Sequence, residues 1–172
     1  SSAAGKRFKL TSVTGPTSPF IVAASTTVTG NYKIQFQVTF DATGVGPDYS
    51  GTVVTVDALN YNITSLPVPF WWDDGSSHPF AFSSPLVVNA SKQYVWVSTS
   101  GLTTLQSGSL SITGSGSVTG NYSTLLKYQV TFTQTGVGGD FGDTIMVIDG
   151  VNYSGLQLPV SFWWDDGSSH SF

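Results

Sequence analysis

Leu66–Phe80 reads LPVPFWWDDGSSHPF, and Leu158–Phe172 reads LPVSFWWDDGSSHSF. The two stretches belong to a longer duplication, in which residues 38–80 align without gaps onto residues 130–172 with 25 of 43 positions identical. This similarity exceeds what shared composition produces, so the chain contains an internal repeat. Upstream, VTGNY occurs at residues 28–32 and again at residues 118–122, with two extra residues before the second duplicated block.

Both copies alternate apolar and polar residues, which is the pattern of half-buried strands. Turns rich in Gly and Asp bound these segments. All ten acidic residues are Asp, so the helix-forming residue Glu is absent. The chain is therefore predicted to be all-β, with apolar strand faces at Ile34, Phe36, Val38 and Phe40 in the first copy and at Tyr128, Val130 and Phe132 in the second.

The bulk composition limits the function classes. Only 9% of residues are charged and the net charge is −4, so no basic face for nucleic acid is expected. The 40% hydrophobic content is enough to form a packed core. The absence of cysteine excludes a disulfide framework. No apolar run reaches the length of a membrane-spanning helix, so no membrane span is expected.

Two features favour an extracellular glycoprotein. The sequence begins with the small residues SSAA and no Met, as expected after signal cleavage. Four Asn-X-Ser/Thr sequons predict N-glycans on exposed turns of a secreted protein. The predicted attachment residues are Asn62, Asn89, Asn121 and Asn152.

The second copy lacks part of the first. The first copy continues beyond Phe80 through further predicted strands, whereas the second stops at the equivalent Phe172. A sandwich without those strands exposes an apolar groove and unpaired backbone edges. The missing region corresponds to residues 81–101.

The N-terminal tail resembles part of this missing region. Lys6–Gly15 reads KRFKLTSVTG and matches KQYVWVSTSG at Lys92–Gly101. Residues 18–27 (SPFIVAASTT) occupy the place of residues 108–117 (GSLSITGSGS), just before the shared VTGNY. The chain thus resembles an array of repeats that is circularly permuted, so that its first strand belongs to a repeat whose other strands lie elsewhere.

Two ways of completing the second domain are compatible with this pattern. The tail could fold onto its own second domain, or enter that of a neighbour as in donor-strand addition. Two prolines in Gly15–Pro19 stiffen the linker and favour the neighbour, which produces a filament because such contacts do not close. A frayed end would not explain the alternation of the tail. The predicted donor strand comprises Arg7, Phe8, Lys9, Leu10, Thr11, Ser12, Val13 and Thr14.

The duplicated FWWDDGSSH block is the main candidate for chemistry. Its carboxylates and histidine could bind a metal or transfer protons, but a polar Asp-Asp-Gly turn is the favoured interpretation. Its aromatic residues could stack on sugars, although Phe70 and Trp72 are expected in the core, with Trp71 covering a junction or glycan. No catalytic, cofactor or metal site is predicted. The residues concerned are Asp73, Asp74 and His78, and their copies Asp165, Asp166 and His170.

Lys33 and Lys127 lie in corresponding first strands. One interpretation is that these lysines form isopeptide bonds with Asn or Asp, and the other is that their charge keeps a strand edge soluble.

The motifs GVG-D, LPV-FWWDDGSSH and GSVTGNY resemble repeats in secreted proteins of thermoacidophilic archaea. With its tail and two repeats, the chain looks most like the subunit of the archaeal thread, a surface filament of the Sulfolobales. The resemblance implies donor-strand complementation between subunits, N-glycosylation, high stability and isopeptide linkage.

We therefore expect a donor tail at residues 1–15 and two tandem immunoglobulin-like β-sandwich domains at residues 16–104 and 105–172. The second domain would be completed by the tail of an identical subunit in an extracellular, cell-surface filament that is not an enzyme. The alternative is a carbohydrate-binding or adhesive module cut from a larger secreted surface protein.

Overall fold

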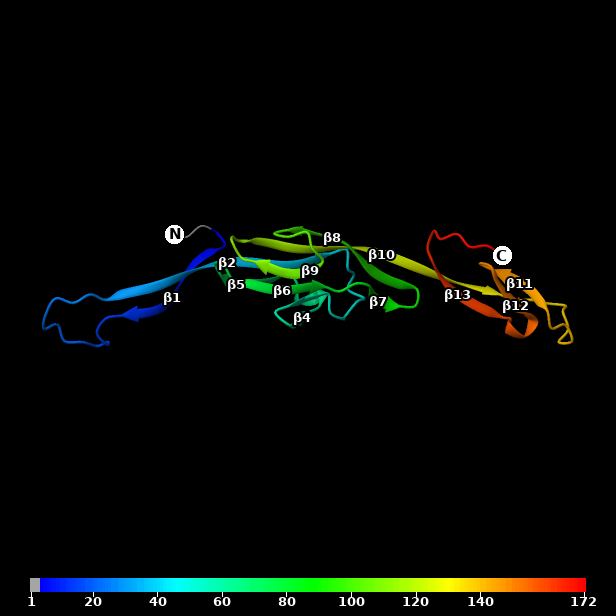
Figure 1. Ribbon diagram of the computed structural model, residues 1–172, viewed down its shortest axis with the longest axis horizontal. Coiled ribbons are helices and arrows are strands. Elements are labelled where there is room, and N and C mark those ends of the chain that lie inside the picture. Colours follow the sequence, from blue (N-terminus) through cyan, green and yellow to red (C-terminus); the bar gives the residue numbers. More distant parts are fainter. Residues whose placement is uncertain (1–3) are drawn as a thin grey trace.

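The computed structural model describes residues 4–172, so residues 1–3 of the predicted tail lie outside the described residues. It is all-β, which confirms the predicted class, with short 3₁₀ turns at Ile63–Ser65 and Gly155–Gln157. The molecule is elongated (Figure 1). We call its parts the N-terminal hairpin (residues 6–36), the first lobe (residues 37–126) and the second lobe (residues 127–172).

The first lobe consists of two sheets with a shared core. In one sheet β7, β8, β10, β2 and β5 are successive neighbours, and the other has the order β4-β3-β6-β9. This arrangement is consistent with a β-sandwich. The strands are β2 (Thr29–Thr43), β3 (Val54–Val56), β4 (Leu59–Tyr61), β5 (Val68–Asp73), β6 (Ser77–Phe82), β7 (Leu86–Asn89), β8 (Lys92–Gly101), β9 (Ser107–Ser111) and β10 (Gly116–Phe132).

The core of the first lobe takes side chains from both sheets. Val38 and Phe40 of β2 are fully buried, because the alternation of that strand points them inward. Full burial of a large apolar side chain contributes about 1.5–3 kcal/mol. Residues that follow the duplicated block (residues 38–80) provide half of the cluster, namely Phe82, Leu86, Tyr94, Leu110, Ile112, Val118 and Tyr122.

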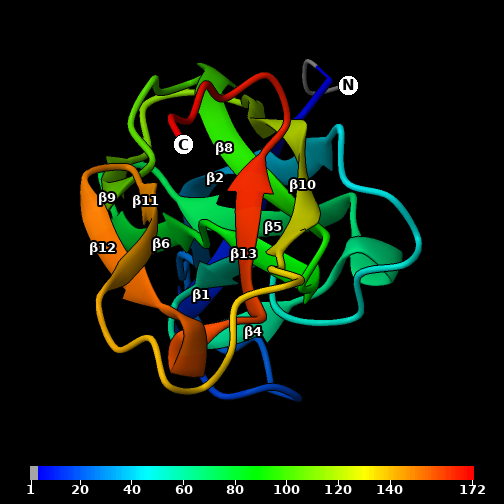
Figure 2. The same ribbon diagram turned by 90° about the vertical axis from the view of Figure 1, so that its right-hand side faces the viewer.

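The second lobe contains fewer strands. β10 continues into it, where residues 127–132 pair with β13 (Val160–Asp165) as residues 35–40 of β2 pair with β5. A separate two-stranded sheet is formed by β11 (Thr144–Ile148) and β12 (Val151–Ser154). Figure 2 views the molecule from this end.

The N-terminal tail forms β1 (Lys6–Thr14), which pairs antiparallel with residues 29–36 of β2. Within this chain it therefore lies on the first copy and not on the second domain. β9 pairs with β6, and residues 116–121 of β10 pair with β2. These pairings join residues 105–126 to the first lobe, whereas the predicted division at 104/105 assigns them to the second domain.

Candidate assembly site

The N-terminal hairpin has a defined register. Phe8 lies opposite Ile34 and Leu10 opposite Tyr32, and the pairing shifts by one residue at Thr11. The β-branched and aromatic residues of both strands favour this extended pairing. Figure 1 shows the hairpin projecting from one end of the molecule, opposite the second lobe.

The β8–β10 hairpin of the first lobe repeats this register. Tyr94 lies opposite Thr124 and Trp96 opposite Tyr122, and the shift falls between Asn121 and Tyr122, opposite Val97. In sequence, Phe8, Leu10 and Thr11 correspond to Tyr94, Trp96 and Val97, so the bulge is at the same place in both hairpins.

Side-chain contacts confirm that the two hairpins are equivalent. The Asn31 amide donates to the Ser12 hydroxyl at 3.0 Å, and the Asn121 amide donates to the Ser98 hydroxyl at 3.1 Å. The Lys6 ammonium lies 5.4 Å from the Phe8 ring centre, and the Lys92 ammonium lies 4.9 Å from that of Tyr94. The N-terminal hairpin is thus a structural copy of β8–β10.

The two hairpins differ in what they cover. β10 pairs in parallel with residues 38–43 of β2, and Tyr94, Val118 and Tyr122 enter the core at 7% exposure or less. Their counterparts in the N-terminal hairpin are largely exposed: Phe8 at 57%, Val28 at 52% and Tyr32 at 62%. The N-terminal hairpin therefore carries the apolar side chains of a core without having that core beneath it.

The second lobe has the opposite deficiency. Residues 130–132 of β10 pair with β13 alone among the strands of residues 4–172, whereas the corresponding residues 38–40 of β2 pair with β5 on one edge and with β10 on the other. Val130 is 36% exposed and Phe172 89% exposed, whereas their counterparts Val38 and Phe80 are 0% and 5% exposed. An apolar face of the second lobe is therefore uncovered in this chain.

A loop beside this face already has the shape found in the first lobe. The Phe141 N–H donates to the Gly138 carbonyl at 3.3 Å, as the Tyr49 N–H donates to the Gly46 carbonyl. Asp48 in the first-lobe loop accepts hydrogen bonds from Lys92 at 2.8 Å and from the Tyr94 hydroxyl at 2.6 Å. These two bonds lower the pKa of the Asp48 carboxyl.

Two glycines in these loops have the left-handed backbone that disfavours other residues. Gly44 has φ +81° and Gly136 has φ +86°. A Cβ on Gly44 would lie 2.0 Å from the Tyr122 carbonyl oxygen, whereas a Cβ on Gly136 would meet nothing within 4 Å. In the first lobe the Tyr122 carbonyl comes so close that residue 44 must be glycine, whereas in the second lobe no residue of the described range lies at the equivalent place beside Gly136.

The FWWDDGSSH block forms the same local structure in both lobes. The imidazole of His78 stacks on Trp72 at 3.9 Å, and that of His170 stacks on Trp164 at 3.7 Å. The Nδ1 atom of each histidine contacts a turn carboxylate, His78 with Asp57 at 2.8 Å and His170 with Asp149 at 2.7 Å. The sequence did not indicate these two Asp partners, which lie 21 residues upstream.

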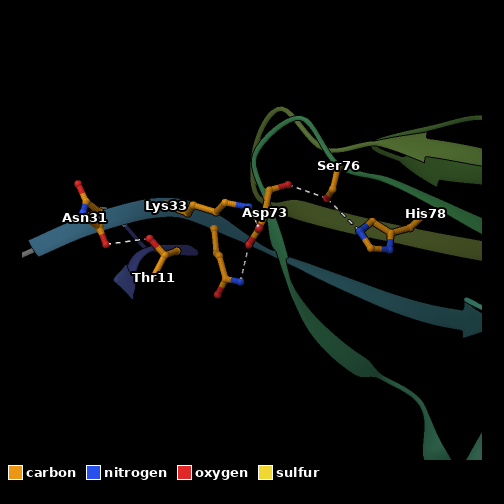
Figure 3. A network of polar contacts seen from close by, with 7 residues as sticks. Thr11, Asn31, Lys33, Asp73, Ser76 and His78 are labelled. Atoms are coloured by element: carbon orange, nitrogen blue, oxygen red, sulfur yellow. Dashed lines mark hydrogen bonds and ion pairs between the residues drawn. The ribbon is translucent and has the colours of Figure 1, made fainter. Parts of the chain in front are cut away.

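The structure directs Asp73 away from His78. Its carboxylate accepts from Gln35 at 2.7 Å. It also accepts from Lys33 at 3.0 Å (Figure 3). Both bonds lower the pKa of Asp73. Within residues 4–172, no three His, Cys, Asp or Glu side chains gather as a candidate metal site. The arrangement is that of a polar turn whose Ser76 hydroxyl donates to the Asp73 carbonyl at 2.6 Å.

The tryptophans of the block have different neighbours. Trp72 is buried and stacks on Phe70 at 4.8 Å, as expected for core residues. Trp71 lies under the Arg7 guanidinium at 4.4 Å, so the N-terminal hairpin covers it. Trp163 remains 44% exposed.

The predicted glycan and crosslink residues also have defined positions. Asn62 caps a 3₁₀ turn, Asn89 lies at the end of β7, and Asn152 lies in β12. Asn121 lies within β10, where its amide donates to Ser98. The Lys33 and Lys127 ammonium groups lie 3.0 and 3.5 Å from Asp73 and Asp165, in exposed ion pairs.

No family model, curated protein or solved structure matches the chain. No helix in the described range has the length and apolar character needed to cross a bilayer.

Proposed function

We propose that this chain is a structural subunit of an extracellular, pilus-like filament, which polymerises head to tail by donor-strand complementation and serves adhesion or cell–cell contact. The observation that carries the proposal is the equivalence of the N-terminal hairpin to β8–β10. β8–β10 completes the first lobe, the second lobe has no such hairpin, and the spare copy projects from the opposite end of the molecule.

The first lobe provides the geometry of the joint. Residues 116–121 pair with residues 38–43, so residues 26–31 of one copy would pair in parallel with residues 130–135 of the next. The Tyr32 carbonyl would then approach Gly136, as the Tyr122 carbonyl approaches Gly44. Lys6 would reach Asp140, as Lys92 reaches Asp48.

The predicted donor strand has a specific role in this joint. Arg7–Thr14 is the outer strand of a preformed hairpin, and the N-terminal part of β2 is the strand that pairs with the neighbour. Phe8 takes the place of the buried Tyr94, and Leu10 takes that of Trp96. Because the hairpin is already folded, less conformational entropy is lost on docking than when a disordered strand inserts.

The proposed joint brings together different surfaces of the two copies. A series of such joints does not close into a ring, so the subunits propagate as a filament. Each completed repeat would be an immunoglobulin-like sandwich, and the proposed assembly is the one that the resemblance of the sequence to the archaeal thread subunit implies. Identical subunits and covalent N-glycans at Asn62, Asn89, Asn121 and Asn152 are the proposed partners.

Deleting residues 1–15 tests the proposal. The truncated chain should remain folded but form no filaments in electron micrographs, whereas a matched chain lacking only residues 1–5 should still form them. Filaments that persist without β1 would contradict donor-strand complementation. An intact chain that stays monomeric at high concentration would instead support the adhesive module of a larger surface protein.

A further inference from the structure

We infer that the connection between β1 and β2 supplies a second donated strand, in which residues 18–22 pair with residues 168–172 of the neighbouring copy. This contact would lie in the sheet opposite the one that receives the hairpin. The inference rests on the proposed head-to-tail assembly and adds a second recognition element to it.

The first lobe contains the corresponding contact. β9 lies on the connection between β8 and β10 and pairs with β6, Leu110 opposite His78 and Gly108 opposite Phe80. Beyond β9, the Ile112 N–H donates to the Ser76 carbonyl at 2.9 Å. The Ile112 carbonyl accepts from the Gly75 N–H at 2.8 Å. The connection between β8 and β10 therefore pairs with one sheet through β9, while β8 and β10 themselves belong to the other sheet.

The acceptor segment is held in place in the second lobe. The Asp149 N–H donates to the Ser171 carbonyl at 3.0 Å, as the Asp57 N–H donates to the Pro79 carbonyl at 3.0 Å. This bond holds residue 171 at the turn after β11, as its counterpart holds residue 79 at the turn after β3. In the described part of the chain, residues 169–172 lack the strand that β9 provides to β6.

The donor segment has the side-chain pattern of β9 and its continuation. Phe20 and Val22 correspond to Leu110 and Ile112, which are 6% and 1% exposed in the core. In this chain Phe20 is 41% exposed and Val22 76% exposed. Ile21 corresponds to the exposed Ser111, so it would point outward in the joint.

Pro19 fits the position that it would occupy. Pro19 corresponds to Ser109 in β9. On either side of Ser109 the backbone groups of even-numbered residues point toward β6, since the Gln106 carbonyl accepts from the Phe82 N–H and the Ile112 N–H donates to the Ser76 carbonyl. The N–H of Ser109 therefore points away from β6. A proline is tolerated there because no ladder hydrogen bond is lost.

The chain length allows this placement. Five residues separate Val22 from Val28, as five separate Ile112 from Val118, so the connection to the pairing strand is equally long. On the other side only Pro16 and Thr17 link Gly15 to Ser18. The three steps from Gly15 to Ser18 span up to about 10 Å, which is the separation of packed sheets.

Serine substitutions distinguish this contact from the hairpin. F20S and V22S should each leave the monomer folded, because both side chains are exposed there, yet weaken subunit association about tenfold or more. I21S removes the side chain that is most exposed of the three and should change association less than about twofold. Equal effects of all three substitutions would overturn the inference.

Cysteine pairs test the register, since the chain contains no native cysteine. Ser111 lies opposite Ser77 in the first lobe, so I21C/S169C should give an intermolecular disulfide ladder on a non-reducing gel. S77C/S111C should crosslink within one chain and serves as the control for the geometry. The ladder should exceed that of I21C/S161C about tenfold, because paired strands hold the thiols at high effective concentration.

Electron microscopy of the same samples separates the inferred second strand from the proposed filament itself. Filaments with the ladder support the inference, and filaments without a ladder overturn it while leaving donor-strand complementation intact. Absence of filaments from the unmodified chain, with monomers at every concentration, contradicts both the filament and the second strand.

Discussion

The first and second lobes share a sequence block but differ in burial. Phe80 and Phe172 occupy the same position in the repeat, yet the first is 5% exposed and the second 89% exposed. The histidine–tryptophan stack, in contrast, is nearly identical in both lobes. The block therefore specifies its own local structure, while burial depends on the strands that cover it. Substitutions at equivalent positions should separate these two contributions.

The largest contrast is expected at the paired glycines. G44A places a Cβ against the Tyr122 carbonyl and should unfold the first lobe in the monomer. G136A adds the same unfavourable backbone strain, about 1–2 kcal/mol, but meets no neighbour within the chain. It should leave the monomer folded and abolish filaments, which circular dichroism and electron microscopy can show. Filaments of normal length from G136A would disprove the proposed Tyr32 contact.

The next contrast concerns Tyr94 and Phe8. Y94A should destabilise the monomer by about 3–5 kcal/mol, because it removes a buried aromatic side chain. F8A should change monomer stability by less than about 0.5 kcal/mol, because Phe8 is exposed in the monomer, but it should weaken assembly if Phe8 is buried in the proposed joint. Urea unfolding below the assembly threshold and sedimentation above it measure the two effects. A substantial loss of monomer stability in F8A would mean that β1 already covers a core.

The hairpin turns give a smaller difference. The β3–β4 turn has Ala58 at φ +64°, and the β11–β12 turn has Gly150 at φ +78°. A58G should raise the free energy of unfolding of the first lobe by about 0.5–1 kcal/mol, because glycine adopts this backbone without strain. G150A should lower that of the second lobe by a similar amount. Thermal melts of both variants would show whether the two turns respond alike.

A charge reversal tests the joint with a smaller effect. Exposed ion pairs contribute about 0.2–1 kcal/mol, so K6D or D140K alone should weaken association a few-fold. The double variant K6D/D140K should restore association, and high salt should reduce all of these differences. Failure of the double variant to recover would argue against the Lys6–Asp140 contact.

The smallest expected effect is the pH dependence of the first lobe. Hydrogen bonds from Lys92 and Tyr94 lower the pKa of Asp48 below its ordinary value of 3.8. The stability that this group contributes is therefore complete above pH 3.8 and is lost as the pH falls through the lower folded pKa. D48N should remove this part of the acid response in urea titrations between pH 5 and 2.

Much of the fold was predictable from the sequence. The alternation around Val38 and Val130 indicated strands, and the match of Lys6–Gly15 to Lys92–Gly101 indicated a strand of a repeat. The pairing of β1 with β2 was not predicted, although both flanks of the hairpin were aligned separately with β8 and β10. A strand alignment reveals similarity but not which edge is free, because backbone pairing depends on segments distant in sequence. For the same reason the Asp57–His78 contact had no local signal.

The continuous strand β10 has a mechanical consequence. β2 and β10 run along the long axis of the molecule and pair in parallel over residues 38–43 and 116–121 (Figure 1). Tension applied along that axis would load this ladder in shear, so its hydrogen bonds resist together and do not unzip one at a time. The same direction of load would apply where residues 26–31 meet the next β10. A chain of such subunits should therefore bear a pulling force that a laterally joined pair of sheets could not.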